Sequence, residues 1–428
     1  LVTMLRISLF SLILVVCVFI SFGHCQNNYN YQFLGQFEVD LPSFLNLGYF
    51  DPENRETVNN TLIITTFSGS RSVTGKIYTV ENIGNQLTSV GNITPKLLTD
   101  DMIWPNEARS VPYEIFSTQT IGTGDGFLVP GKSTGSVSII PLDTGIPHAI
   151  STPKNGWFYH VAEWWDMNGD GLMDCVSARA TVPTFKPPQG ELVWFENPGD
   201  NFFSTTWEEH VLASGPDIMI HLIWLDESSS QPQIVAAEFF SNEITLWWLE
   251  GNTTWSDTSA IRSRVIDSDM GAPFDVQYVD LNNDGKKDLL ATNHEHAADE
   301  SAVFAYEVPE NWQTDPWTRH VLATNITTLK IGPNQASPGE AVAFHPNTTD
   351  TNSKAQIIVG GDGAEVAFML YPESEDPSNW TYIREDIIST GCTVGQVAVG
   401  DVNGDSLVEF FVPAYENGII YVYSYGEN

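Results

Sequence analysis

The sequence predicts an all-β fold, a seven-bladed β-propeller of four-stranded blades, and three observations support it. One acidic loop occurs three times along the chain, at intervals of about two repeat lengths. Short runs of β-branched and aromatic residues alternate with Gly, Asn and Pro, a pattern typical of strands. The last repeat ends one strand short, while an unassigned strand is present near the N-terminus.

The repeats define the length of the structural unit. The acidic loops begin 114 and 121 residues apart, and they are DMNGDGLMD (166–174), DLNNDGKKD (280–288) and DVNGDSLVE (401–409). A second signature fills the gaps: WEEHVLA (207–213), WTRHVLA (317–323) and the weaker RSRVIDS (262–268). Each interval spans two units, so one unit has roughly 55 to 65 residues, as in other repeat architectures.

The last unit shows the four strands in order. GQVAVG (395–400) leads into the acidic loop, EFFVPAY (409–415) follows the loop, and GIIYVYSY (418–425) is the third strand. In other units the fourth strand carries the Trp/His-Val-Leu signature. Here it is missing, and we expect YQFLGQFEVD (31–40) to replace it and close the ring. Two β-sandwiches would fit the even spacing less well.

Composition and charge limit the class of partner. With 33 Gly, 24 Pro and 12% aromatic residues, the chain has the turn formers and strand formers of an all-β protein. Its formal net charge of −36 predicts repulsion from nucleic acid and from anionic membranes. Divalent cations are the natural counterions of such a chain.

The N-terminus resembles a secretory signal peptide. We take Met4 as the start, Arg6 as the basic n-region and residues 7–22 as an apolar run of 16 residues. Cleavage after Gly23 or Cys25 would leave residues 26–428 as a single domain. The run is shorter than the ~20 residues that span a bilayer, although an uncleaved anchor stays open. No later segment could span a membrane, so we expect a secreted, extracellular protein.

Sequons and cysteines agree with export. Six N-x-S/T sequons predict a glycosylated surface, at Asn59, Asn92, Asn252, Asn325, Asn347 and Asn379. Cys17 and Cys25 belong to the signal region, which leaves Cys175 and Cys392. Two cysteines are too few for a disulfide framework. The repeat assignment places them far apart around the ring, so we do not expect them to pair.

The acidic loops supply oxygen ligands at positions 1, 3, 5 and 9, with a backbone carbonyl at position 7, which is the pattern for calcium. The residues are Asp166, Asn168, Asp170, Leu172 and Asp174; Asp280, Asn282, Asp284, Lys286 and Asp288; and Asp401, Asn403, Asp405, Leu407 and Glu409. Gly171 and Gly285 occupy position 6, where a sharp bend favours glycine. Ser406 stands there in the third loop, so we expect that site to be weaker.

These loops are not EF-hands. Position 12, where an EF-hand has a bidentate Glu, is occupied by Ser177, Ala291 and Val412, and strands flank the loops. The alternative is that they are Asx-rich turns without metal.

With these loops at these intervals, residues 32–428 resemble the FG-GAP/VCBS repeat family, the seven-bladed propellers of the integrin α-chain type. The resemblance implies two or three structural calcium ions, held on the lower rim between the first and second strands of a blade. The remaining blades keep the strand plan without the loop.

The opposite, upper face is the candidate ligand site. A polar residue stands near the start of each first strand: Asn46, Glu107, His160, His221, Asp275, Glu340 and Gln396. Loops between second and third strands should reach the same face, and they supply Arg179, Lys132, Glu238, His294, Glu295, His296, Asp362, Tyr415 and Glu416. Propeller channels are wet, so polar residues there need no function.

NHEH (293–296) carries two imidazoles at positions i and i+2, which point to one side of an extended segment. They could share a second metal with His160, His221 or Asp275, with Glu107 or Glu340 as a base. His210 and His320, beside Trp in the repeated outer strand, fit a structural role. The Trp-rich third strands fit a core between blades better than carbohydrate platforms.

Two functions follow. The favoured one is a secreted, monomeric, calcium-binding module that recognises an extracellular protein or glycan through its upper face. The alternative is a metal-assisted lyase or hydrolase acting on sugars. No nucleophile elbow, P-loop, HExxH or dinucleotide fingerprint identifies a reaction. Convergence of three or more of His160, His221, Asp275, His294 and His296 at metal-ligand distances would favour the enzyme.

Overall fold

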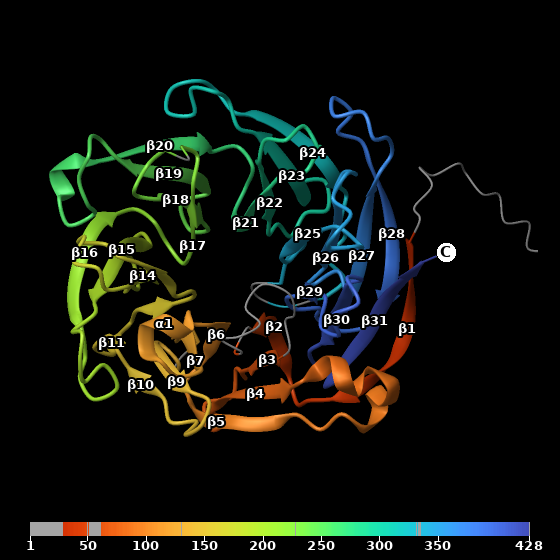
Figure 1. Ribbon diagram of the computed structural model, residues 1–428, viewed down its shortest axis with the longest axis horizontal. Helices are drawn as coiled ribbons and strands as arrows, with labels where there is room; N and C mark the ends of the chain where they lie inside the picture. Colours follow the sequence, from red (N-terminus) through yellow and green to blue (C-terminus); the bar gives the residue numbers. More distant parts are fainter. Residues whose placement is uncertain are drawn as a thin grey trace, which may run out of the picture.

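Seven antiparallel sheets stand around a central axis in the computed structural model, which describes residues 29–48, 50, 61–129, 131–226, 228–330, 332 and 335–427 (Figure 1). Each sheet has four strand positions, and the first strand of each lies nearest the centre of the ring. This confirms the predicted seven-bladed propeller. The apolar run at 7–22, the cleavage sites and Asn59 lie outside the described residues.

The first three blades run from the centre outward as follows. Blade 1 contains β2 (Pro42–Gly48), β3 (Thr61–Thr66), β4 (Gly75–Glu81) and β5 (Lys96–Met102). Blade 2 contains β6 (Pro105–Ser110), β7 (Thr120–Asp125), β9 (Val137–Pro141) and β10 (His148–Ala149). In blade 3 the inner strand is broken into β12 (Phe158–Tyr159) and β13 (Glu163–Trp165), followed by β14 (Asp174–Thr181), β15 (Gln189–Glu196) and β16 (Glu208–Ser214).

The next three blades have unbroken strands. Blade 4 contains β17 (Met219–Ile223), β18 (Gln233–Glu238), β19 (Glu243–Leu249) and β20 (Ile261–Asp267). Blade 5 contains β21 (Pro273–Val279), β22 (Asp288–Asn293), β23 (Ala302–Glu307) and β24 (Thr318–Thr324). Blade 6 contains β25 (Ala341–Phe344), β26 (Gln356–Gly360), β27 (Val366–Pro372) and β28 (Tyr382–Ser389).

Blade 7 joins the two ends of the chain. It contains β29 (Ala398–Gly400), β30 (Glu409–Ala414), β31 (Ile419–Glu427) and, as its outer strand, β1 (Tyr29–Glu38). β1 pairs with β31 from Tyr29 opposite Glu427 to Glu38 opposite Ile419, with a bulge between Phe33 and Gly35. The predicted closure of the ring by the N-terminal strand is therefore confirmed.

The remaining elements are short. β8 (Thr134–Gly135) pairs with β11 (Lys154–Asn155) beside blade 2. Three helical turns lie in connections rather than in blades: η1 (Ile83–Asn92), α1 (Tyr113–Phe116) and η2 (Thr258–Ala260). Within the described part of the chain, no helix is long and apolar enough to cross a membrane.

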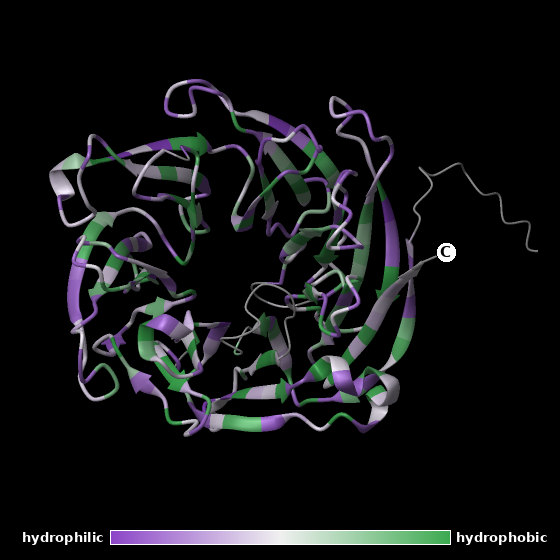
Figure 2. Ribbon diagram, viewed as in Figure 1, coloured by the Kyte–Doolittle hydropathy of each residue, from purple (hydrophilic) through white to green (hydrophobic). Residues whose placement is uncertain are grey.

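The core lies between adjacent blades, because each sheet presents two apolar faces. Leu290 and Val303 of blade 5 share one buried cluster with Ile357 and Phe368 of blade 6. Apolar residues recur along the blade strands (Figure 2), and second strands such as β22 and β30 are buried at every position. Trp194 is 1% exposed and packs into a cluster shared by blades 3 and 4, so this third-strand Trp serves the core.

Candidate functional site

The innermost strands bring polar residues from all seven blades to the channel. Asn46, Glu107, His221 and Asp275 lie on β2, β6, β17 and β21, and His160, Glu340 and Gln396 lie next to β12, β25 and β29. Two of these residues bridge blade 1 and blade 7, because Asn46 Nδ2 donates to Gln396 Oε1 at 3.2 Å. His221 Nε2 and Asp275 Oδ1 are 3.0 Å apart and bridge blades 4 and 5.

Two charged residues that the sequence interpretation missed extend this polar ring. Arg109 Nε donates to Glu107 at 2.5 Å, and Arg109 Nη1 donates to Glu163 Oε1 at 2.6 Å. Glu163 in turn lies 3.8 Å from His221 Nδ1. Arg109 follows Glu107 by two residues on one strand, so the strand period placed both on the same side. That alternation was the signal in the sequence that could have found it.

The pKa values of two histidines of the ring are shifted in opposite directions. Burial lowers the pKa of His160 to about 4, and its Nδ1 has no hydrogen-bond partner among the described residues. Burial also lowers the pKa of His221, but the hydrogen bond and charge of Asp275 outweigh burial and raise it overall. His160 is therefore neutral at pH 7. Its ring packs edge-on against Phe44, with centroids 5.1 Å apart.

Glu340 is a channel residue whose carboxyl group is buried. Glu340 is 4% exposed, and neither of its carboxylate oxygens has a hydrogen-bond partner in the described part of the chain. Burial raises the pKa of Glu340 well above its usual value, and the charges of Glu107 and Asp275 raise it further. Glu107 is also buried, and burial raises its pKa despite the opposing effect of Arg109.

The two histidines of the NHEH segment separate in the structure. His294 Nε2 lies 3.0 Å from Asp362 Oδ2, whereas His296 is exposed and its Nδ1 lies 3.0 Å from the carbonyl oxygen of Gln335. Of the five histidine and aspartate candidates, His221 and Asp275 pair with each other, whereas His294 and His296 contact residues outside the set. Among the described residues, the one group of three side chains with metal-ligand spacing lies elsewhere, on the outer strands of blade 3: Glu196, Glu208 and His210.

Arg179 lies within β14 rather than in a loop, and it does not open onto the channel mouth. It is 1% exposed, and its guanidinium donates to Glu191, Glu209 and the Tyr159 hydroxyl at 2.8 to 2.9 Å. These carboxylates come from β15 and β16, the outer strands of the same blade. We therefore leave Arg179 out of the site.

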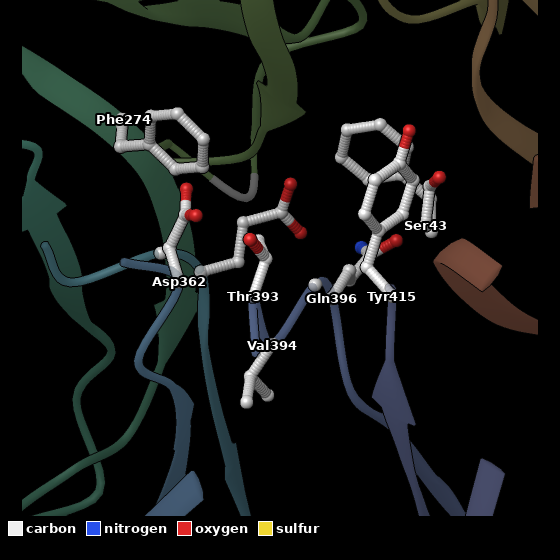
Figure 3. Close-up of a pocket in the computed structure, with 11 residues that line it drawn as sticks. Ser43, Phe274, Asp362, Thr393, Val394, Gln396 and Tyr415 are labelled. Atoms are coloured by element: carbon white, nitrogen blue, oxygen red, sulfur yellow. The ribbon is translucent and has the colours of Figure 1, made fainter. Parts of the chain in front are cut away.

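A pocket opens at the channel mouth beside Glu340 (Figure 3). Its empty volume is about 400 Å³, and its lining comes from blades 1, 5, 6 and 7: Ser43, Phe44, Phe274, Gly339, Glu340, Asp362, Thr393, Val394, Gly395, Gln396 and Tyr415. Figure 3 shows Phe274 and Asp362 on one side and Ser43, Gln396 and Tyr415 on the other. Strand starts and loops between second and third strands meet here, as the repeat plan predicts.

Glycine is required where blades 7 and 1 meet in this pocket. A Cβ on Gly395 would lie 1.9 Å from the carbonyl oxygen of Ser43, which no side chain could tolerate without a shift of the backbone. The close approach lets Phe44 and Gln396 form a parallel bridge between the two blades.

The three acidic loops lie between first and second strands, as expected, and share one hydrogen-bond pattern. Asp166 accepts the backbone N–H groups of Gly169 and Gly171, at 2.7 and 2.9 Å. Asp280 and Asp401 accept the corresponding groups of their loops. Ser406 has φ 73°, close to the 85° of Gly285, so the third loop keeps the backbone shape at the expense of strain.

The donor set of the loops fits a hard cation. The last acid of each loop, Asp174, Asp288 or Glu409, is buried and accepts an N–H from the second residue of its loop. Burial raises the pKa of each of these carboxyls to about 7, and the other two carboxylates of the loop raise it further. A calcium ion would offset this repulsion through oxygen ligands.

The predicted glycosylation sites differ in how far the asparagine side chain is exposed to solvent. Asn92, Asn252 and Asn325 are exposed, whereas Asn347 and Asn379 are half-buried. Asn347 Nδ2 donates to the Tyr29 hydroxyl at 3.3 Å, so attachment of a glycan there would break a contact between blades 6 and 7. Cys175 and Cys392 are both buried, free thiols.

A family model agrees with the resemblance seen in the sequence. Residues 230–291 match the FG-GAP-like repeat, over a span that begins before β18, includes the second acidic loop and ends within β22. The chain is therefore a seven-bladed propeller that carries an FG-GAP-like repeat. No sequence among the curated proteins matches it.

Solved structures of similar shape are distant in sequence. A chain in the S. cerevisiae complex of dbp5 with nup159, gle1, IP6 and ADP is 11% identical, with 93% of this chain and 95% of that chain covered and a TM-score of 0.49. Oligogalacturonate lyase from Vibrio parahaemolyticus is 9% identical, with 94% of each chain covered and a TM-score of 0.46. The soluble aldose sugar dehydrogenase of Escherichia coli is 10% identical, with 94% of this chain and 100% of that chain covered and a TM-score of 0.43. At these values the similarities carry no argument about activity.

Proposed function

We propose that this protein is a secreted, calcium-stabilised propeller that binds an extracellular protein or glycan through its upper face, at the pocket beside Glu340. The observation that carries the proposal is the pocket itself. It joins four blades at the channel mouth and combines aromatic and polar side chains, the composition of many ligand sites. The pocket is small, so it suits one side chain or sugar residue rather than a large ligand.

Secretion is part of the proposal and rests on the sequence. The apolar segment at 7–22 and the exposed sequons at Asn92, Asn252 and Asn325 support it. The net charge of −36 supports a partner other than nucleic acid.

The sugar lyase or hydrolase lacks an observation in its favour. It needs a metal held by three or more ligands, or a base poised beside a substrate. His221 pairs with Asp275 and His294 pairs with Asp362, while His296 points to a backbone carbonyl. His160 is buried against Phe44. The geometry supports binding better than catalysis.

The test is a binding screen that compares a variant substituted in the upper-face pocket with a variant substituted on the opposite face. The protein is displayed as a labelled tetramer to a glycan array and to a panel of extracellular proteins. We expect a bound probe whose affinity falls at least about tenfold when Phe274 and Asp362 are both replaced by Ala, because both side chains line the pocket. Asp226→Ala, in the exposed hairpin between β17 and β18, is the matched control.

Two results would overturn the proposal. One is a probe that binds the double variant as tightly as the original protein. The other is the absence of any bound probe in both arrays while the protein is folded, as judged by its melting temperature.

A further inference from the structure

The side chains of the pocket beside Glu340 indicate which class of ligand it binds. This inference rests on the proposed function of the pocket as a binding site. Glu340 lines the pocket, is 4% exposed, and has two oxygens without a hydrogen-bond partner among the described residues. A buried carboxyl group without a hydrogen-bond partner is energetically unfavourable, so such groups in proteins are nearly always paired. A ligand that pairs with Glu340 would therefore gain binding energy.

The surrounding charges do not balance Glu340. Glu107 on β6, Asp275 on β21 and Asp362 after β26 all add negative charge near it, and Arg109 is the positive group that opposes them. Arg109 is already held by Glu107 and Glu163, at 2.5 and 2.6 Å. The nearby imidazoles of His221 and His294 are held by Asp275 and Asp362.

The hydroxyl groups of the pocket cannot supply the missing donors. Ser43 Oγ donates to the Leu41 carbonyl oxygen at 3.1 Å, and Thr393 Oγ1 donates to Glu416 Oε1 at 3.1 Å. The Tyr415 hydroxyl donates to the Phe67 carbonyl oxygen at 2.7 Å. Each hydroxyl has one proton to donate, so these three groups offer only lone pairs to a ligand. A ligand that brings donors of its own would pair with these lone pairs and with the oxygens of Glu340.

Aromatic rings complete the walls. Phe44, Phe274 and Tyr415 line the pocket together with the acidic side chains. The faces of such rings attract organic cations through the negative charge of the ring face. A pocket with carboxylates, hydroxyl lone pairs and aromatic rings is complementary to an ammonium or guanidinium group.

We propose that the pocket beside Glu340 receives a lysine or arginine side chain from a protein partner. A neutral glycan could donate hydroxyl protons but would leave the excess negative charge unopposed. A metal ion would need more ligands, and the described residues gather no group of three metal-binding side chains here. Arginine offers five N–H donors and lysine three, which matches a site of acceptors.

Calorimetric titration of the folded, full-length protein tests the proposal. The probes are Nα-acetylarginine amide and Nα-acetyllysine amide, and Nα-acetylcitrulline amide is the uncharged analogue of the first. We expect a cationic probe to bind at least about tenfold more tightly than the citrulline probe. Glu340→Gln keeps the shape and removes the charge, and it should weaken that probe by at least about tenfold. Glu310→Gln, an exposed site, is the control.

Proton release gives a second readout. Burial raises the pKa of Glu340 well above its usual value, and a cation bound beside the carboxyl group should favour release of its proton. Affinity should then rise with pH, by up to about tenfold for each unit below that pKa. The rise should vanish in Glu340→Gln. Equal binding of the citrulline probe, or an unchanged affinity and pH profile in Glu340→Gln, would overturn the inference.

Calcium ions are titrated into the same cell to test whether the pocket is a metal site. If calcium displaces the cationic probe from the Glu310→Gln control but not from Glu340→Gln, the inference is overturned. The proposed function can survive that failure. If a partner from the binding screen is lost in the Phe274 and Asp362 double variant while no cationic probe binds, the upper face binds by another chemistry.

Discussion

Asp217, just before β17, shows how a single buried carboxyl group couples stability to pH. Its Oδ2 accepts the backbone N–H of Phe240 at 3.0 Å, and its Oδ1 has no partner among the described residues. Burial raises the pKa of Asp217 to about 8, and the charge of Glu238 raises it further. In the unfolded chain the pKa returns to about 3.9. Between these two values the native state holds a proton that the unfolded state has lost.

Stability should therefore fall as pH rises from 5 to 8, by up to about 1.4 kcal/mol per pH unit from this group. Asp217→Asn cannot ionise and keeps an oxygen for Phe240. We expect its stability relative to the original protein to increase as pH rises from 5 to 8, as measured by urea unfolding at constant calcium. Asp143→Asn, an exposed site, is the control. Equal pH slopes in the original protein and Asp217→Asn would contradict this account.

At the scale of elements, the hairpin between the first and second strands is the unit that we propose to hold calcium. The three loops share their hydrogen bonds, and each carries a buried final acid beside two other carboxylates. The corresponding hairpin of blade 4 has Asp226 but not the motif. It therefore provides an internal comparison.

Chelation should remove two or three calcium ions and lower the melting temperature. Each site occupied at a hundredfold excess over its Kd contributes about 2.7 kcal/mol to the free energy of unfolding. Asp170→Ala and Asp284→Ala should each reduce the calcium content by one ion, measured by mass spectrometry, because each removes the ligand at position 5. Asp226→Ala should leave the content unchanged. Loops that act as turns without metal would show no bound calcium in any variant.

At the scale of the whole molecule, closure of the ring depends on strands from the two ends of the chain. The Tyr31 ring of β1 packs edge-on against Phe410 and Tyr425, at centroid distances of 5.4 and 5.7 Å. Phe33, two residues along the same strand, is 53% exposed. Tyr31 is half-buried, so the two aromatic residues of this strand differ in burial.

Tyr31→Ala should lower the free energy of unfolding by about 2 kcal/mol or more, because it removes aromatic contacts that hold β1 to blade 7. Phe33→Ala should cost less than about 1 kcal/mol. Removal of residues 29–38 should destabilise the protein more than either substitution, since it exposes the edge of β31. Urea unfolding measures all three. Similar losses for Tyr31→Ala and Phe33→Ala would show that the closure does not depend on the aromatic contacts of Tyr31.

The sequence by itself determined the repeat, the strand order, the acidic loops and the closure of the ring. These features follow from local chemistry repeated at a fixed spacing, such as oxygen side chains at alternate positions of a turn. It also placed Glu340, Asp362 and Tyr415 on one face, because the plan of a blade fixes which loops share a rim.

Only the tertiary structure decided which of these polar residues meet. His294 pairs with Asp362 and His221 with Asp275, while Arg109 is held by Glu107 and Glu163. The carboxyl group of Glu340 has no hydrogen-bond partner in the part of the chain that the structure describes. Strand period says on which side a residue lies, but partners across the channel come from other blades, some of them more than 50 residues away. Their distances depend on how seven sheets pack around one axis, and no local pattern in the chain encodes that packing.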